Sequence, residues 1–509
     1  MSDIIATERR RRSRALSRVV LSALIPASLL LSLSAWALAS PVGASPDDDY
    51  HMASIWCGQG LRHGLCEAGD APNERRIPAV LLDTSSCFAF HPKQSASCPL
   101  PSSHVLVNTS RGNFDGSYPP IYYAAMSVFA GPDVDSSIIR MRLANAVLFV
   151  AMIVALFLLL PRALRPSLLW PVLIAMVPLG LFLVASVNPS SWAILSATGL
   201  WLALIGFATA ERRSRQVVFG VLSVVLTVMG AGARSDAALF AALAVVIAGI
   251  MTFERSRRWL LRAILPVALI ALGAVFFLTS GQSGVVAPDA HPSADSTSAI
   301  AFTLATLLQL PSLWVGVLGT WGLGWLDTAM PALVWVPTIF AFSAVLFAGL
   351  RRMPPRKAIA AAVAFAAVIA IPLYVLVKDR VPVGAGVQPR YVLPLIIILT
   401  GIVVWGAVRR GTSLTRLQYV VVAVLLSVAQ MVALQVNIRR YVTGIDVYSP
   451  DLDAKAEWWW NLPFGPNWVW VIGSIAFALA VSGMLLAISR SDRVHPFAAA
   501  PAMILDRTS

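Results

Sequence analysis

The sequence predicts an all-α polytopic membrane protein, a bundle of about twelve transmembrane helices with a large first extracytoplasmic loop. Of its 509 residues, 58% are hydrophobic and only 13% are charged, whereas soluble globular proteins carry roughly 25% charged residues. Apolar runs of about 20 residues, the length that crosses a bilayer, recur along nearly the whole chain. This composition excludes a cytosolic enzyme, a disordered chain and a disulfide-knotted secreted domain.

The expected spans alternate with polar connections. A basic cytoplasmic segment at 1–18 precedes the first span and a tail at 489–509 follows the last, while outer loops are expected at 41–137, 378–390 and 437–466. The twelve spans are expected at residues 19–40, 138–160, 168–186, 191–210, 216–233, 237–253, 262–279, 331–350, 358–377, 391–408, 417–436 and 467–488.

Positive charge is concentrated on one side of this arrangement. With the N-terminus in the cytoplasm, 25 of the 39 Lys and Arg residues lie inside, together with only 6 of the 25 acidic residues. This is the positive-inside pattern of membrane proteins. The net charge of +14 therefore indicates topology and contact with anionic membrane lipids, and nucleic acid is excluded as a partner. We expect a plasma-membrane protein with both termini in the cytoplasm.

The first span could be either a signal peptide or a retained anchor. The Arg-rich start and the small residues before Ser45 are typical of a signal peptide, but the apolar run of about 20 residues exceeds the usual h-region of 7–15. We therefore expect a retained anchor.

The segment 280–330 begins polar and continues apolar through Leu323. Counting 301–323 as a span would place the basic cluster Arg351–Lys357 outside, so we expect an interfacial or re-entrant element.

All four cysteines, Cys57, Cys66, Cys87 and Cys98, fall in the expected outer loop 41–137. Four cysteines allow three pairings, and we expect Cys57 to pair with Cys66 and Cys87 with Cys98. A metal site is the alternative, but the Cys-x-x-Cys spacing usual for structural zinc is absent. Disulfides persist on the oxidising side of a membrane. The two pairs would order a loop that is far longer than an ordinary connection.

The densest polar cluster, Asp47, Asp48 and Asp49 followed by His51, comes directly after the first span. Three successive carboxylates repel one another, which raises at least one pKa and favours a catalytic base or a cation site. They could hold a divalent cation or work without one. The alternative is a cap for a helix that begins near Tyr50, because Asp is a favoured N-cap residue. His51 would orient a carboxylate or lie exposed at the surface.

Five short motifs are spread from about residue 40 to residue 445: Pro46-Asp47-Asp48 with His51, Arg142-Leu-Ala-Asn145, Ser186-Val-Asn-Pro-Ser190, Leu323-Gly-Trp-Leu-Asp-Thr328 and Gln388-Pro-Arg-Tyr391. In these motifs the chain resembles an uncharacterised bacterial family of multi-pass membrane proteins, carried under a domain-of-unknown-function name. That family is grouped with the GT-C superfamily of membrane glycosyltransferases, which the order of parts also resembles. Asp48 stands where the family usually has Glu and Pro389 where Gly is commoner, so either Asp47 or Asp48 could be the base.

The resemblance implies transfer of a sugar from a polyprenyl-phosphate donor to a hydroxyl of a cell-envelope glycan, lipid or protein on the outer face. The acceptor hydroxyl needs a carboxylate base, for which Asp47 or Asp48, with His51, are the candidates. The leaving phosphate needs cations, preferably arginine, whose planar fork binds two oxygens. Candidate phosphate-binding residues are Arg390, Arg380, Lys378, Arg439, Arg440 and Arg234, with the pair Arg140 and Arg142. Arg390 ranks first because it lies at the mouth of an apolar span.

Several other residues have two interpretations. Trp325, Asp327 and Tyr391 are candidate substrate-binding residues, although Asp327 could equally cap a turn. Trp458 to Trp460 could stack on sugar rings, but an aromatic belt at the membrane interface is the commoner arrangement. Asn188-Pro189 is most simply a tight turn between two spans.

Two other functions stay open: a transporter or flippase of envelope precursors, and a non-catalytic partner in envelope assembly. Coupled transporters usually place ionisable residues near the bilayer midplane, yet six of the expected spans contain none. The chain has no Gly-x-x-x-x-Gly-Lys motif and no Gly-x-Gly-x-x-Gly that opens a helix after a strand, which fits a lipid-linked donor. An enzyme should place Asp47 or Asp48 and an outer arginine around one cavity.

Overall fold

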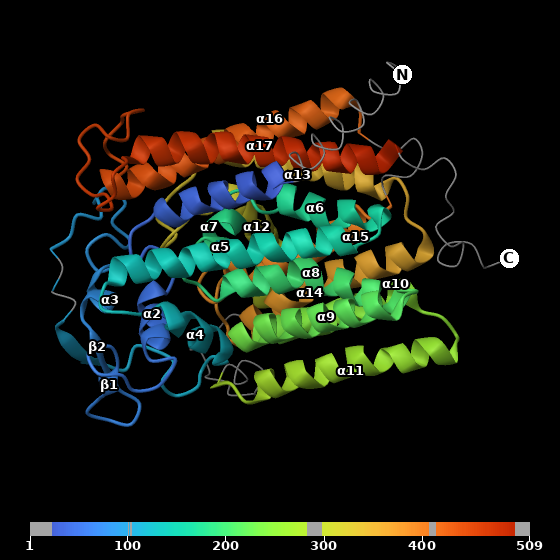
Figure 1. The fold of residues 1–509 in the computed structure, drawn as a ribbon, viewed down its shortest axis with the longest axis horizontal. Coiled ribbons are helices and arrows are strands. Elements are labelled where there is room, and N and C mark those ends of the chain that lie inside the picture. Colours follow the sequence, from blue (N-terminus) through green and yellow to red (C-terminus); the bar gives the residue numbers. More distant parts are fainter. Residues whose placement is uncertain (1–22, 100, 102–103, 282–297, 407–413, 494–509) are drawn as a thin grey trace, which may run out of the picture.

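A computed structural model describes residues 23–99, 101, 104–281, 298–406 and 414–493, and it is mostly helical, at 67%. Figure 1 shows long helices side by side along the long axis, with the short elements of the first loop gathered at one end, which we call the loop end. These short elements are α2 (Asp48–Trp56), β1 (Glu67–Ala68), β2 (Arg75–Pro78), α3 (Val80–Asp83), β3 (Leu106–Thr109), α4 (Ile121–Met126) and a 3₁₀ turn, η1 (Ser127–Phe129).

Both expected disulfides are confirmed, Cys57 with Cys66 and Cys87 with Cys98. The same loop forms a small antiparallel sheet in the order β1-β2-β3, with Arg75 of β2 opposite Thr109 of β3. Its helices bury Ile55, Trp56 and Tyr122 in the main hydrophobic core, and the disulfides add covalent closure. The first loop is therefore a built structure and not a flexible tether.

Long apolar helices form the bundle, because each backbone hydrogen bond is satisfied within the helix and the side chains can face lipid. Nine helices in the described part of the chain are long and apolar enough to cross a membrane, and three more apolar helices are shorter. The expected class, a multi-pass helical membrane protein, is confirmed, whereas the count of about twelve spans is not. The nine are α5 (Val134–Leu159), α8 (Ser190–Thr209), α9 (Arg213–Ala233), α11 (Arg257–Leu278), α12 (Ala299–Val315) with a π-helical turn to Thr320, α13 (Ala332–Leu350), α14 (Pro355–Lys378), α16 (Arg416–Val442) and α17 (Pro466–Arg493); the shorter three are Ala23–Leu38, α10 (Asp236–Thr252) and α15 (Pro389–Val403).

The helices differ greatly in how much of their surface other helices cover. In α8, 83% of the most apolar window is buried inside the bundle, whereas in α11 only 11% is buried. Figure 1 shows α11 at the edge of the bundle, as this low coverage requires. The centre of the bundle is thus α8 with the segments that surround it.

Two expected boundaries differ from the structure. The span expected at 168–186 is broken into α6 (Arg165–Ile174) and α7 (Leu179–Val184), and Pro178, which lacks a backbone donor, stands at the break. The span expected to end at 436 continues as α16 to Val442, so the loop expected at 437–466 begins later. In the segment 280–330, α12 runs unbroken into its π-helical turn; its expected re-entrant placement stays a prediction.

Some expected segments lie outside the described residues. They are the cytoplasmic start at 1–18, most of the tail at 489–509 and the polar first part of the segment 280–330.

Candidate functional site

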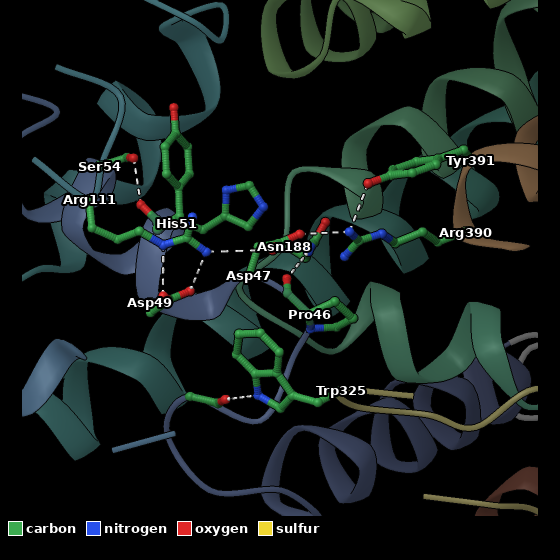
Figure 2. Close-up of polar contacts among 12 residues, drawn as sticks. Pro46, Asp47, Asp49, His51, Ser54, Arg111, Asn188, Trp325, Arg390 and Tyr391 are labelled. Atoms are coloured by element: carbon green, nitrogen blue, oxygen red, sulfur yellow. Dashed lines mark hydrogen bonds and ion pairs between the residues drawn. The ribbon is translucent and has the colours of Figure 1, made fainter. Parts of the chain in front are cut away.

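Asp47 is the residue immediately before α2, and its side chain is turned toward arginines. Its backbone is left-handed, with φ at 58°, a conformation that Asp tolerates better than most residues. Its carboxylate accepts a hydrogen bond of 2.6 Å from Arg390 Nη2 and lies 3.7 Å from Arg111 Nη2. Figure 2 shows Asp47 between these two arginines. The helix begins at Asp48 and not near Tyr50, and the Asp47 carboxylate forms ion pairs instead of capping it.

The three neighbouring carboxylates differ in their surroundings. Asp48 is completely buried and one of its oxygens accepts a hydrogen bond from the Ser45 amide at 3.0 Å. Asp49 binds the Arg111 guanidinium through both of its oxygens, at 2.8 and 3.1 Å. Among the described residues, no group of three His, Cys, Asp or Glu side chains could hold a metal ion. Asp47 and Asp49 therefore share Arg111, whereas Asp48 is buried apart from both.

The two candidate bases have opposite pKa shifts. Burial by itself would raise the pKa of Asp47, but the charge and hydrogen bond of Arg390, with the charge of Arg111, hold it below its ordinary value. Burial raises the pKa of Asp48 to about 7, against a smaller opposing effect of Arg142. Carboxylates whose environments separate their pKa values can take different roles. Asp47 is ionised and partly exposed, whereas Asp48 is out of reach of any ligand.

Arg390 lies at the start of α15 and is only 5% exposed. Its Nη2 atom donates to Asp47 and, at 2.7 Å, to the hydroxyl of Tyr391. The remaining nitrogens, Nε and Nη1, are buried and have no hydrogen-bond partner among the described residues. The Tyr391 ring lies 4.8 Å from the Arg390 guanidinium and 4.7 Å from that of Arg234. Unpaired buried N–H groups on a cation are costly, and they indicate an anion site.

A small pocket of about 10 Å³, room for about one water molecule, lies beside Arg390. Its lining is almost entirely apolar or backbone, and Arg390 is its one charged residue. The other lining residues include Pro46, Leu179, Phe182, Trp321, Leu323, Leu326, Gln388 and Pro389. The pocket therefore places one buried cation beside an apolar surface.

His51 is buried within the site and is not exposed at the surface. It is 1% exposed, and its Nδ1 lies 3.0 Å from the hydroxyl of Tyr123. The rings of Tyr50, Tyr118 and Tyr123 all contact it. Burial, together with the nearby arginines, lowers its pKa to about 3. His51 is therefore neutral, and it can exchange a hydrogen bond but does not carry charge.

The other motifs converge on the backbone that leads to Asp47. Arg142 is fully buried and donates three hydrogen bonds, of 2.5 to 2.9 Å, to carbonyl oxygens within residues 37–41. Asn188 donates to the Pro46 carbonyl at 3.0 Å, so the Asn-Pro pair does more than form a tight turn. Trp325 binds the Gly43 carbonyl at 2.9 Å. Residues far apart in the sequence thus fix the position of the carboxylate.

Arg440 and Asp327, predicted to bind donor phosphate and substrate, instead pair with each other inside the protein. Their ion pair is 2.8 Å long, and neither side chain is more than 6% exposed. Arg440 also donates to the backbone carbonyls of Phe88 and Gln94. Because α16 continues past the expected boundary, Arg440 is part of a packed helix. In this position the charge of Arg440 holds the first loop against α16, and its binding of a donor phosphate stays a prediction.

The remaining arginine and lysine candidates lie in different surroundings. Arg234 is buried beside Tyr391 but is paired with Asp236 at 2.7 Å. Arg439 lies over the Tyr448 ring, at 5.7 Å. Lys378 and Arg380 are half-buried, and the described lining of the pocket does not include them. Of these candidates, Arg390 and Arg234 both lie over the ring of Tyr391.

One aromatic prediction needs revision, whereas Trp325 stays a candidate substrate-binding residue. Trp460 is 6% exposed and donates to the Leu38 carbonyl at 2.8 Å, so it packs against the first helix instead of joining an interfacial belt. Trp325 is half-buried and contacts both the Gly43 carbonyl and the ring of Phe90. Trp321, which lines the pocket, was not among the predicted residues.

Sequence reasoning also missed Arg111 and Tyr123. Arg111 is a single arginine in a long polar loop, and its partners Asp47 and Asp49 lie about 60 positions earlier, so nothing local indicates the pairing. Tyr123 lies in a short tyrosine pair on α4, a signal that could suggest a buried hydroxyl but not its partner.

One protein-family model covers most of the chain. Residues 30–399 match a family described as a predicted membrane protein, DUF2142. The chain belongs to the DUF2142 family. The DUF2142 match includes Asp47, Arg142, Asn188, Trp325 and Arg390. No curated protein and no solved structure matches the chain.

Proposed function

We propose that this protein is a membrane glycosyltransferase of GT-C type, which transfers a sugar from a polyprenyl-phosphate donor to a hydroxyl of a cell-envelope acceptor. The reaction would take place at the loop end, which we place on the outer face of the membrane. Two disulfides in the loop support this side, because disulfides persist in an oxidising compartment. The motif resemblance to GT-C enzymes is an analogy, and the proposal depends on the site.

The observation that carries the proposal is the position of Arg390 between an ionised carboxylate and an apolar pocket. Two of its buried nitrogens have no hydrogen-bond partner in the described chain, and the pocket beside it is apolar. A polyprenyl phosphate has the matching chemistry, since a phosphate stands at the end of an apolar chain. Arginine binds phosphate through two parallel N–H groups. The free Nε and Nη1 atoms point in different directions, so each could donate one hydrogen bond to a phosphate oxygen while Nη2 keeps its contact to Asp47.

Asp47 is the proposed general base. The acceptor oxygen would attack the anomeric carbon of the donor while Asp47 takes the hydroxyl proton. The bond from that carbon to the phosphate oxygen breaks, and its electron pair leaves with the phosphate. Negative charge thus moves from Asp47 to the phosphate, and Arg390, which pairs with Asp47, would also bind the phosphate. A fixed cation at the group where charge develops lowers the barrier.

The test is donor turnover by purified protein in nanodiscs, with a panel of polyprenyl-phosphate sugars and release of polyprenyl phosphate as the readout. Asp47→Asn keeps the size of the side chain and tolerates the left-handed backbone, so folding should survive. Turnover should fall by roughly 10²–10⁴, the usual loss on removing a general base. Arg390→Ala should weaken donor binding, and Arg390→Lys should restore it in part, because an ammonium cannot bind two oxygens in one plane.

Asp49→Asn is the matched control, since Asp49 is the same residue type two positions away and binds only Arg111. Its effect should be milder than that of Asp47→Asn. Full activity of Asp47→Asn would contradict the mechanism. Movement of a lipid-linked sugar across proteoliposomes without release of polyprenyl phosphate would favour a flippase instead.

A further inference from the structure

Phe90 and Leu326 are two bulky apolar residues in the left-handed backbone region, each with φ at 65°. Such residues are true outliers there, and strain of this kind persists only where the surroundings impose it. Both side chains are also exposed, Phe90 at 67% and Leu326 at 38%. Trp325 links them, because it precedes Leu326 in the chain and its ring lies 5.6 Å from that of Phe90.

Several interactions hold Phe90 in this exposed position. It lies inside the loop that the Cys87–Cys98 disulfide closes. Its amide donates to Asp327 at 3.1 Å, on the same carboxylate oxygen that binds Arg440. Below this loop is a small separate core of Ala44, Phe88, Ala96 and Tyr441, which Trp325 packs against. A disulfide, a buried ion pair and a small core therefore support a side chain that faces solvent.

The three residues adjoin the proposed donor pocket. Leu326 lines that pocket together with Pro46, which directly precedes Asp47. Trp325 is fixed to the same segment through its hydrogen bond to the Gly43 carbonyl. Figure 2 shows Trp325 on the Pro46 side of the carboxylate, with Arg390 on another side. A ligand on Trp325 would thus reach the rim of the pocket from outside.

We propose that Phe90, Trp325 and Leu326 form a platform that binds a saccharide ring of the acceptor. This inference rests on the proposed function, because it names the acceptor of the same site. A sugar ring has an apolar C–H face and a rim of hydroxyls. Rigid aromatic side chains offer the complementary apolar surface with little loss of conformational entropy. The exposed polar residues His91, Lys93 and Gln94 follow Phe90 directly and can bind the hydroxyls.

These polar neighbours favour a saccharide over an acyl chain or a protein helix as the occupant. Either apolar partner would leave the charged Lys93 beside a desolvated surface, which is unfavourable. The platform is also a few side chains wide, whereas protein interfaces bury roughly 800 Å² on each partner.

The test uses Phe90→Gly in the full-length protein in nanodiscs. Glycine removes the ring and relieves the left-handed backbone strain, so the fold should be retained or stabilised. Binding is measured with gluco-, galacto-, manno- and arabino-oligosaccharides of two to six units. We expect at least one of them to bind wild type and to bind Phe90→Gly about tenfold or more weakly, as for loss of an aromatic contact. Phe90→Tyr should bind like wild type. Val128→Ala, which trims an apolar side chain of the same loop that is 68% exposed, is the control.

Several outcomes would overturn the platform. They are binding of none of the four oligosaccharide classes, equal binding by Phe90→Gly and wild type, or an equal loss with Val128→Ala. Weaker binding of a polyprenyl phosphate by Phe90→Gly would assign the surface to the lipid instead. The oligosaccharide assay measures binding and needs no turnover. If oligosaccharides bind the platform but no polyprenyl phosphate is released from any donor, the glycosyltransferase reaction is refuted and the platform is not. If turnover is present, Phe90→Gly should raise the acceptor KM and leave the donor KM unchanged.

Discussion

Replacing Asp48 by Asn should change how the stability of the protein depends on pH. Asp48 is completely buried, and one carboxylate oxygen accepts a hydrogen bond from the Ser45 amide. The other oxygen, Oδ1, is buried with no partner among the described residues. Asn has the same shape and can accept the same bond, but it carries no charge at any pH. The substitution therefore isolates the cost of ionising this buried group.

The magnitude follows from the pKa. Burial raises the pKa of Asp48 from 3.8 to about 7, so the folded protein binds this proton more tightly than the unfolded chain. The stabilisation from the proton is complete below pH 3.8 and is lost as the pH rises through about 7. At 1.36 kcal/mol for each pH unit, the whole effect is about 4 kcal/mol, of which about 2.5 kcal/mol falls between pH 5 and pH 8.

The assay is thermal or denaturant unfolding of wild type and Asp48→Asn in the same detergent, at pH 5 and pH 8. Relative to wild type, Asp48→Asn should gain about 2.5 kcal/mol of stability between pH 5 and pH 8, because wild type loses the stabilisation from the proton over this interval. Other titrating groups are common to both and cancel in the difference. Asp49→Asn, whose carboxylate is paired with Arg111 near the surface, should show no such gain. If Asp48→Asn gains no stability relative to wild type between pH 5 and pH 8, the buried-proton argument is refuted.

Three further predictions concern topology, covalent structure and packing. A reporter fused within 41–137 should read as extracytoplasmic and one at 254–262 as cytoplasmic; the opposite readings would overturn the assignment of the outer face. Non-reducing mass spectrometry should find the Cys57–Cys66 bond, and replacing both cysteines by serine should lower the free energy of unfolding by about 3 kcal/mol. Arg142→Met should destabilise the protein by about 3 kcal/mol or more, because three buried carbonyls lose a charged donor; unchanged unfolding would show that these bonds are replaced.

The features that depend on local sequence could be predicted. Helices over 134–159 and 332–350 follow from apolar runs of bilayer length, because in lipid each segment must satisfy its own backbone hydrogen bonds. The pairing of Cys57 with Cys66 followed from their nearness in the chain. Asp47 and Arg390 could be singled out by residue type and by position at the ends of spans.

Only the tertiary structure decided which of these residues meet. Asp47 and Arg390 are 343 positions apart, and their 2.6 Å contact depends on how α2 and α15 pack. The difference between Asp47 and Asp48, adjacent and chemically identical, also comes from packing, which pairs one with arginines and buries the other. Arg440 was expected in an outer loop as a candidate phosphate-binding residue, and it is fully buried and paired with Asp327. The length of an apolar run is a local property, whereas burial and ion pairing are properties of the whole fold.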